Sequence, residues 1–202
     1  MRLIITRHGE TLENRAGLLQ GHNEGSLSPT GLEQAKALAL RIKDESIDMI
    51  YCSDLGRAVK TAAEITFFHA NIKIEYTEEL RERNFGEFQG KRRDEIGWSL
   101  NDKYSKFPDP LDGESAAEVY LRAGRFLDSI IDKHLSDTIL LVCHGYIGKV
   151  LLGIISGKTI CEISSGESLR NTSLTVYNID AKTNEALIID SVAHLEKPIR
   201  NF

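Results

Sequence analysis

The chain of 202 residues is poor in cysteine, carries no excess of positive charge and contains no long apolar run. Its cysteines, Cys52, Cys143 and Cys161, are an odd number at unrelated spacings, which predicts a fold without disulfide bonds in a reducing cytoplasm. The formal net charge of -5 argues against a broad surface for nucleic acid or anionic membranes, because phosphate-backbone binding needs a basic face. No apolar run approaches the length of a membrane span and no signal-like segment opens the chain, so we expect no membrane partner.

The sequence also lacks the spacings that metal sites need. Its six histidines and three cysteines show no paired-ligand pattern and no accompanying carboxylate cluster, so we expect neither a metal nor another cofactor. No internal repeat, low-complexity tract or linker divides the chain. Apolar residues make up 41% of it, which is enough for one sizeable core, and we expect a single domain over residues 1–202.

Apolar runs and amphipathic segments alternate along the chain. The short, β-rich apolar runs predict strands at 1–6, 47–52, 72–76 and 138–143. Amphipathic patterns predict helices at 30–44, from about 54 to 68, from about 116 to 133 and at 146–155. The late runs 173–179 and 186–192 predict an antiparallel hairpin at the sheet edge. This order predicts an α/β protein with three α/β/α layers, a mostly parallel central sheet and a late antiparallel edge strand.

Two helix starts carry capping signals. Thr30 is followed three residues later by Glu33, a spacing that predicts a capping box at the first helix. Ser53 or Asp54 is expected to cap the second helix, which places Arg57 in the first turn of that helix.

Cationic and imidazole side chains follow three of the predicted strands. Arg7 and His8 end the first strand, Arg57 lies shortly after the second, and His144 follows the strand at 138–143. Ligands of open α/β sheets bind beyond the carboxyl ends of the strands, so these groups together predict an anion site. The alternative for Arg57 is a solvated arginine, but a cation in the first turn of a helix opposes the helix dipole, and an anion between the two would relieve this.

A long irregular segment, 11–28, comes directly after His8. Loops of this length are uncommon without a function, and Asn14 and Gln20 can fold back to donate amide hydrogens to a bound phosphate. Turn formation is an equally good explanation, because asparagine and glycine favour turns in any protein.

The motifs along the chain resemble those of the histidine phosphatase superfamily, also called the phosphoglycerate mutase-like family. The resemblance runs from Met1 to about Leu174 and is carried by Arg7-His8-Gly9-Glu10, Ser53-Asp54-Leu55-Gly56-Arg57-Ala58, Leu80-Arg81-Glu82 with Phe85-Gly86-Glu87-Phe88-Gln89-Gly90, and Cys143-His144-Gly145. It implies a metal-independent phosphomonoester hydrolase that acts through a phosphohistidine intermediate on small phosphorylated metabolites.

The resemblance also implies a role for individual residues. His8 is the expected nucleophile, because neutral imidazole is nucleophilic near pH 7, and its other ring nitrogen should donate to a backbone carbonyl. Glu82 matches the acid that protonates the leaving group and then activates water, although spacing alone does not select it over Glu79 or Glu87. The groups expected to hold the phosphoryl oxygens are Arg7, Arg57 and a protonated His144, with Asn14, Gln20, Gly21 and Gly145 lining the pocket and His22 beside it.

Within the family, the compact form of this chain resembles the broad-specificity and α-ribazole phosphatases. Cofactor-dependent phosphoglycerate mutases carry a longer insertion between the acid and the second histidine, whereas 144 minus 82 leaves 62 residues here. A phosphoglycerate mutase remains an alternative, as does a pseudoenzyme that binds a phosphorylated ligand without turnover. The natural substrate and the oligomeric state, monomer or dimer, cannot be read from the sequence.

Some positions depart from the family pattern. Cys52 and Cys143 stand where serine is more common, and Gly148-Lys149 follows the second histidine in place of a bulky apolar residue and an arginine. Cys143 is expected to be an inert packing residue at the end of a buried strand. The aromatic side chains Trp98, Tyr104 and Phe107 are expected to form either a substrate-pocket wall or a cover for the core.

Overall fold

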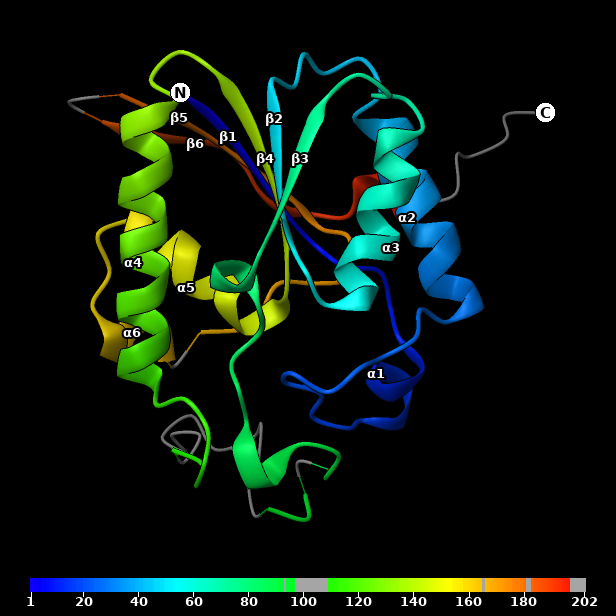
Figure 1. Cartoon of the computed structure of the whole chain (residues 1–202), viewed down its shortest axis with the longest axis vertical. Helices are drawn as coiled ribbons and strands as arrows, with labels where there is room; N and C mark the ends of the chain where they lie inside the picture. The colour runs from blue at the N-terminus through cyan, green and yellow to red at the C-terminus, as the bar shows by residue number, and fades with distance from the viewer. Residues whose placement is uncertain (93, 97–108, 165, 181–182, 197–202) are drawn as a thin grey trace.

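The computed structural model describes residues 1–92, 94–96, 109–164, 166–180 and 183–196. These residues form one six-stranded sheet with helices on both faces (Figure 1). The predicted aromatic group of Trp98, Tyr104 and Phe107 lies outside the described residues.

The strand order across the sheet is β3-β2-β4-β1-β5-β6. The first four strands of the chain pair in parallel, whereas β5 is antiparallel to β1 and β6 is antiparallel to β5. The predicted fold class is therefore confirmed, including the late antiparallel hairpin at the edge. The strands are β1 (Arg2–Arg7), β2 (Met49–Ser53), β3 (Lys73–Thr77), β4 (Thr138–Cys143), β5 (Leu174–Ile179) and β6 (Asn184–Ser191).

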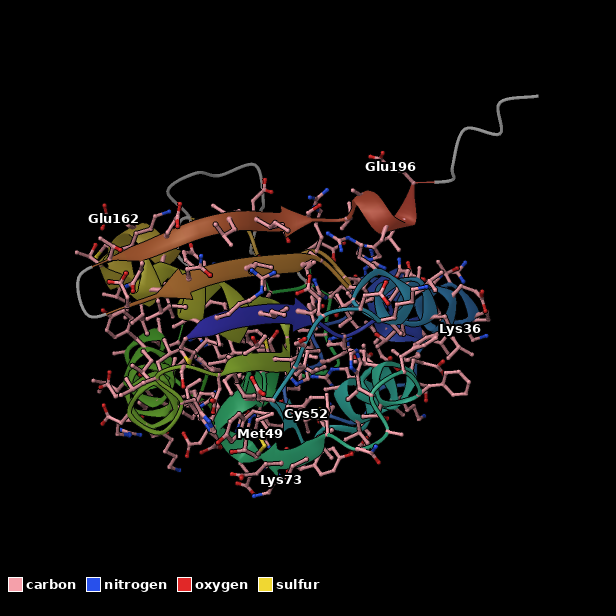
Figure 2. All side chains as sticks on the ribbon, turned by 90° about the horizontal axis from the view of Figure 1, so that it is seen from above. Lys36, Met49, Cys52, Lys73, Glu162 and Glu196 are labelled. Atoms are coloured by element: carbon pink, nitrogen blue, oxygen red, sulfur yellow. The ribbon has the colours of Figure 1, made fainter. Side chains whose placement is uncertain are left out.

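The helices form two layers. In Figure 1, α2 and α3 lie on one side of the sheet and α4, α5 and α6 on the other. Figure 2 shows the same separation, with Lys36 of α2 and Glu162 of α6 on opposite sides. The α-helices are α1 (Leu12–Ala16), α2 (Pro29–Arg41), α3 (Gly56–Thr66), α4 (Ala116–Lys133), α5 (Gly145–Ile155) and α6 (Ile160–Ser164), and the short 3-10 helices are η1 (Glu78–Leu80), η2 (Gly86–Phe88) and η3 (Ala193–Leu195).

The central strands are apolar on both faces because both faces are covered. In β1, Ile4 packs into the core beneath α2 and α3, while Leu3 and Ile5 pack into the core beneath α4 and α5. Every residue of β2 is buried, as are the last five residues of β4. Continuous apolar runs are typical of strands that helices cover on both sides.

The predicted caps are wrong in both helices. Ser28, and not Thr30, is the N-cap of α2, because Pro29 has no N–H and suits the first helical position, and the Ser28 hydroxyl accepts from Gly31 N at 2.9 Å. The N-cap residue of α3 is Leu55, which makes no side-chain cap bond. Ser53 and Asp54 use their side chains elsewhere, as described below.

The carboxyl ends of the parallel strands point toward one end of the molecule. Figure 1 shows α1 and the segment that follows β3 at this same end. The register pairs Arg7 of β1 with Cys143 of β4, so the residues that follow them, His8 and His144, emerge side by side. The sheet therefore brings together residues that are far apart in the sequence.

Candidate active site

Two histidines form the centre of the candidate site. The rings of His8 and His144 lie 5.0 Å apart between centroids at an interplanar angle of 61°. Both residues are buried, with 2% and 0% of their surface exposed. Their proximity follows from the β1–β4 register, since each histidine directly follows its strand.

His8 is held as a neutral imidazole with a defined orientation. Its Nδ1 lies 2.7 Å from the carbonyl oxygen of Gly9, so Nδ1 carries the proton and Nε2 keeps its lone pair. Burial, followed by the charges of Arg7 and Arg57, lowers the pKa of His8 well below its usual value. The nucleophilic form is therefore present at neutral pH, and the expected backbone carbonyl partner is that of Gly9.

Arg57 is buried, with 1% of its surface exposed, so the solvated-arginine alternative is wrong. Its Nε donates to His144 Nδ1 at 3.2 Å, and its terminal nitrogens donate to the carbonyls of Gly21 at 2.7 Å and Asn23 at 2.9 Å. Burial lowers the pKa of Arg57 to about 10, which leaves the guanidinium charged at neutral pH. Arg57 thus joins the irregular segment 17–28 to the second histidine.

His144 is also neutral in this structure. The positive charge expected on its ring belongs to the complex with a phosphate dianion. Burial, then the charges of Arg57 and its neighbours, lowers the pKa of His144 well below its usual value. Arginine can only donate, so His144 accepts at Nδ1, and its Nε2–H donates to the Ser53 hydroxyl at 2.8 Å. A bound phosphate dianion would oppose these effects by favouring the charged imidazole.

Arg7 approaches the same site from the end of β1. Its guanidinium donates to the carbonyl of Leu169 at 2.6 Å. It also lies over Gly145, the first residue of α5, where an added Cβ would stand 3.3 Å from the guanidinium carbon. A side chain at position 145 would therefore crowd Arg7.

Glu82 lies at the start of α5, beside the second histidine in space although 62 residues separate the two in the chain. Its Oε1 accepts from the backbone N–H groups of Tyr146 at 3.1 Å and Ile147 at 3.0 Å, and Oε2 lies 3.0 Å from Tyr146 N. Oε1 also accepts from Arg83 N at 3.0 Å. The carboxylate oxygens thus satisfy N–H groups that have no partner within the helix.

Ion pairs hold the segment that carries Glu82, and the sequence did not reveal them. Arg81 makes a two-point contact with Asp54 at 2.8 and 2.5 Å, which lowers the pKa of that carboxyl. Arg122 of α4 donates to the backbone carbonyl of Arg81 at 3.1 Å and pairs with Glu114 at 2.8 Å. These contacts attach the residue before Glu82 to the segment after β2 and to α4.

Arg83 lies in the charge-rich segment that follows β3, and 0% of its surface is exposed. Its guanidinium pairs with Asp109 at 2.7 Å and lies 5.3 Å from the Tyr146 ring centroid. Charge-rich segments resemble solvated loops in a sequence, and only the structure shows which charges face inward.

The segment 11–28 contributes both turn structure and site residues. Asn14 forms the expected turn, since its Oδ1 accepts from Thr11 N at 3.2 Å in a capping box at α1. Gln20 is buried, and its Oε1 has no hydrogen-bond partner within the described part of the chain. Gly21 has φ +55°, a conformation that favours glycine, and this turns its carbonyl toward Arg57. His22 Nε2 lies 2.9 Å from the Glu82 carbonyl oxygen.

Close packing with α2 gives the reason for glycine at position 9. An added Cβ at this position would stand 2.3 Å from the carbonyl oxygen of Gly31, in the first turn of α2. Gly9 therefore allows α2 to approach the end of β1. The cysteines Cys52 and Cys143 are buried free thiols, and burial raises the pKa of both, as expected for inert packing residues.

The described residues contain no group of three or more histidine, cysteine, aspartate or glutamate side chains placed to hold a metal ion. Within the same part of the chain, no helix is both long and apolar enough to cross a membrane.

Unfolding should take up protons in mildly acidic solution, because His8 and His144 are neutral in the folded protein. An unfolded histidine has a pKa near 6.5, so at a pH between that value and the folded-state pKa the unfolded chain binds more protons. The free energy of unfolding should therefore fall as the pH drops below about 6.5, by about 1.4 kcal/mol per pH unit for each histidine. Urea unfolding of the wild type and of His8→Ala across this range should show a shallower dependence in the variant. Equal slopes would contradict the neutral state assigned to His8.

Comparisons with known proteins agree with this geometry. Residues 3–190 match the sequence profile of the histidine phosphatase superfamily (branch 1). The metal-independent phosphoserine phosphatase of Arabidopsis thaliana is 32% identical over 204 residues, which cover 96% of this chain and 82% of the relative. The solved structure of Bacillus stearothermophilus YhfR gives a TM-score of 0.86 at 31% identity and covers 96% of this chain and 99% of its own. The alpha-ribazole phosphatase of Shigella flexneri gives 0.83 at 26% identity, with 95% and 96% covered.

Proposed function

The chain belongs to the histidine phosphatase superfamily, branch 1, and we propose that it hydrolyses phosphomonoesters through a phosphohistidine formed at His8. It is a metal-independent phosphatase of small phosphorylated metabolites. One observation carries the proposed mechanism: the His8 imidazole is neutral, fixed through Nδ1, and subject to the charges of Arg7 and Arg57. A nucleophile for an in-line attack and the cations for the phosphoryl oxygens thus lie together.

In the first step, the lone pair of His8 Nε2 attacks phosphorus and the bond to the ester oxygen breaks. The Gly9 carbonyl stabilises the positive charge that develops on the ring, because it accepts from Nδ1–H. Arg7 and Arg57 bind the phosphoryl oxygens, for which their planar guanidinium groups are well shaped. The departing alkoxide takes a proton from Glu82 and leaves as an alcohol.

In the second step, Glu82 takes a proton from water while the water oxygen attacks phosphorus. The bond between phosphorus and Nε2 breaks, which releases phosphate and restores the neutral imidazole. Glu82 is thereby reprotonated for the next turnover.

The remaining pocket residues bind rather than react in this proposal. Asn14 and Gln20 donate amide hydrogens to the phosphoryl group, and Gly21 and Gly145 leave room for it. His144 helps to hold the phosphoryl oxygens once the dianion has raised its proton affinity. The proposed catalytic set is His8, Glu82, His144, Arg7 and Arg57. Arg7 ends β1 and His8 follows it, Arg57 lies in α3, Glu82 lies between η1 and η2, and His144 lies between β4 and α5.

Relatives suggest the class of substrate. They include proteins named phosphoserine phosphatase and adenosylcobalamin/alpha-ribazole phosphatase, and their substrates are small phosphomonoesters. We infer a similarly small substrate here and a cytoplasmic setting, which the three free cysteines favour. The net charge of -5 favours a small metabolite over nucleic acid as the partner.

A panel of phosphomonoesters tests the proposed reaction. Phosphoserine, 3-phosphoglycerate, α-ribazole phosphate, fructose 2,6-bisphosphate and p-nitrophenyl phosphate are supplied in turn, and free phosphate and isomerised product are measured separately. We expect phosphate release from at least one small ester, with the rate unchanged by a chelator. Isomerised phosphoglycerate without phosphate release would favour a mutase, and chelator-sensitive activity restored by magnesium or zinc would contradict the metal-independent mechanism.

A further inference from the structure

The turn that precedes β5 runs alongside the end of β1, where the nucleophile stands. Thr172 N donates to the carbonyl of Arg7 at 3.0 Å, and Ser173 N donates back to the carbonyl of Arg170 at 3.1 Å, which closes a tight turn. The side chain of Asn171, inside this turn, is therefore carried toward His8 by the backbone pairing.

The Asn171 amide group joins the nucleophile to a pocket residue. Its Nδ2 donates to the carbonyl oxygen of His8 at 3.0 Å and to Oδ1 of Asn14 at 3.3 Å. One NH2 group has two hydrogens, so both are used by these two acceptors.

The contact with Asn14 decides how that amide is oriented. Asn14 Oδ1 accepts from Asn171 Nδ2 and from Thr11 N, so two donors face the same atom. Because the oxygen is committed in this way, the NH2 group of Asn14 must point elsewhere. If the Asn14 side-chain amide were turned by 180°, its NH2 group would face Thr11 N and Asn171 Nδ2, which are both donors.

The backbone at the next residue is held in an unfavourable conformation. Thr172 has φ +53°, a region that β-branched side chains rarely adopt, and it is fully buried. Its hydroxyl donates to the carbonyl of Asn171 at 2.8 Å. Such conformations persist where the surrounding structure requires them, and they are frequent beside active sites. The strained turn keeps the Asn171 side chain beside His8.

We propose that Asn171 is a positioning residue of the phosphatase reaction. It holds the backbone carbonyl of His8 in place through a hydrogen bond. It also orients the Asn14 amide so that the nitrogen of that amide donates to the phosphoryl group. The inference rests on the proposed function, because it assumes that His8 is the nucleophile and that Asn14 binds the phosphoryl group.

Aspartate and alanine substitutions separate this role from simple packing. Asn171→Asp keeps the size of the side chain but places a carboxylate oxygen against the two acceptors, the His8 carbonyl oxygen and Asn14 Oδ1. The Asn14 amide should then rotate by 180° to present its NH2 group to the carboxylate, and that NH2 group would no longer donate to the phosphoryl group. We expect kcat/KM to fall about 100-fold in Asn171→Asp and about tenfold in Asn171→Ala. The inhibition constant of inorganic phosphate should rise in both variants.

A double-mutant cycle tests the coupling to Asn14. If Asn171 acts through Asn14, adding Asn171→Ala to Asn14→Ala should lower kcat/KM by less than about threefold, compared with about tenfold in the wild-type background. Asn178→Ala and Asn178→Asp are matched controls, because Asn178 is exposed and pairs with Arg2 at the far end of β1. Both controls should keep wild-type kcat/KM.

Specific outcomes would overturn the assignment of Asn171. Fully additive effects in the cycle would refute the coupling to Asn14, and activity losses that match the loss of folded protein in both Asn171 variants would leave Asn171 without a positioning role. A wild-type enzyme that forms no phosphohistidine would instead overturn the proposed function. A wild type that forms one, together with an additive cycle, would refute the orientation of Asn14 by Asn171 and leave the proposed function standing.

Discussion

Replacing His8 with alanine is expected to lower kcat by at least about 10⁴-fold, because covalent catalysis is lost together with the nucleophile. Arg7, Arg57 and the second histidine would still attract the phosphoryl group, so substrate should bind while turnover stops. Direct attack by water is the remaining route, and phosphomonoesters resist it strongly. The loss should therefore appear in kcat rather than in KM.

Trapping the intermediate gives a direct measurement. The wild type, quenched in alkali during turnover of a ³²P-labelled ester, should carry an acid-labile label on His8, and His8→Ala should carry none. His134→Gln is the matched control, because His134 lies between α4 and the start of β4, at the end of the strands opposite the candidate site. There it contacts Tyr51 at 3.0 Å and Asp137 at 2.8 Å. Labelled protein in His8→Ala, or a label on His144 in the wild type, would refute the assignment.

Replacing Glu82 with glutamine should lower kcat by about 10²- to 10⁴-fold and leave phosphate binding nearly unchanged. The amide can retain the fold of the site, since its oxygen can occupy the place of Oε1 and accept from Tyr146 N and Ile147 N. Its nitrogen then replaces Oε2 and no longer accepts from Tyr146 N, which keeps Oε1 as its acceptor. An amide cannot deliver or take up the proton at this position. The variant thus removes the proton transfer and keeps the packing.

The comparison of kcat with the inhibition constant of phosphate decides the role of Glu82. Glu79→Gln serves as the control, because Glu79 is an exposed carboxylate three residues earlier in the chain, and it should retain wild-type kcat. If Glu82→Gln weakened phosphate binding as much as it slowed turnover, Glu82 would have a structural role at the start of α5 instead of a catalytic one.

The features that the sequence predicts well are those that repeat along the chain. Uninterrupted apolar runs such as Ile139–Val142 occur where helices cover both faces of a sheet, and the amphipathic pattern of α4 marks its buried side. The position of Arg57 in a first helical turn could also be derived, because a strand and a helix flank it. These patterns are local, so they can be identified without knowing which distant segments pack against them.

The sequence did not predict which of several possible hydrogen-bond or ion-pair partners a polar side chain would take. Ser53 and Asp54 looked like helix caps, but Ser53 contacts His144 and Asp54 pairs with Arg81. A short polar side chain has several possible partners, and the sequence does not show which of them lies within hydrogen-bonding distance in the folded protein. For the same reason Asn171 gave no signal, since both of its acceptors lie more than 150 residues away in the chain.

The sequence by itself determined the strands, the four longer helices and the kinds of groups that follow each strand, because hydrophobic periodicity and residue chemistry are properties of short segments. Only the tertiary structure decided that His8 and His144 are neutral, that Arg83 is buried, and that Asn171 joins His8 to Asn14. Burial and hydrogen bonding depend on which distant segments pack together, and the parallel register of β1 and β4 places His8 beside His144.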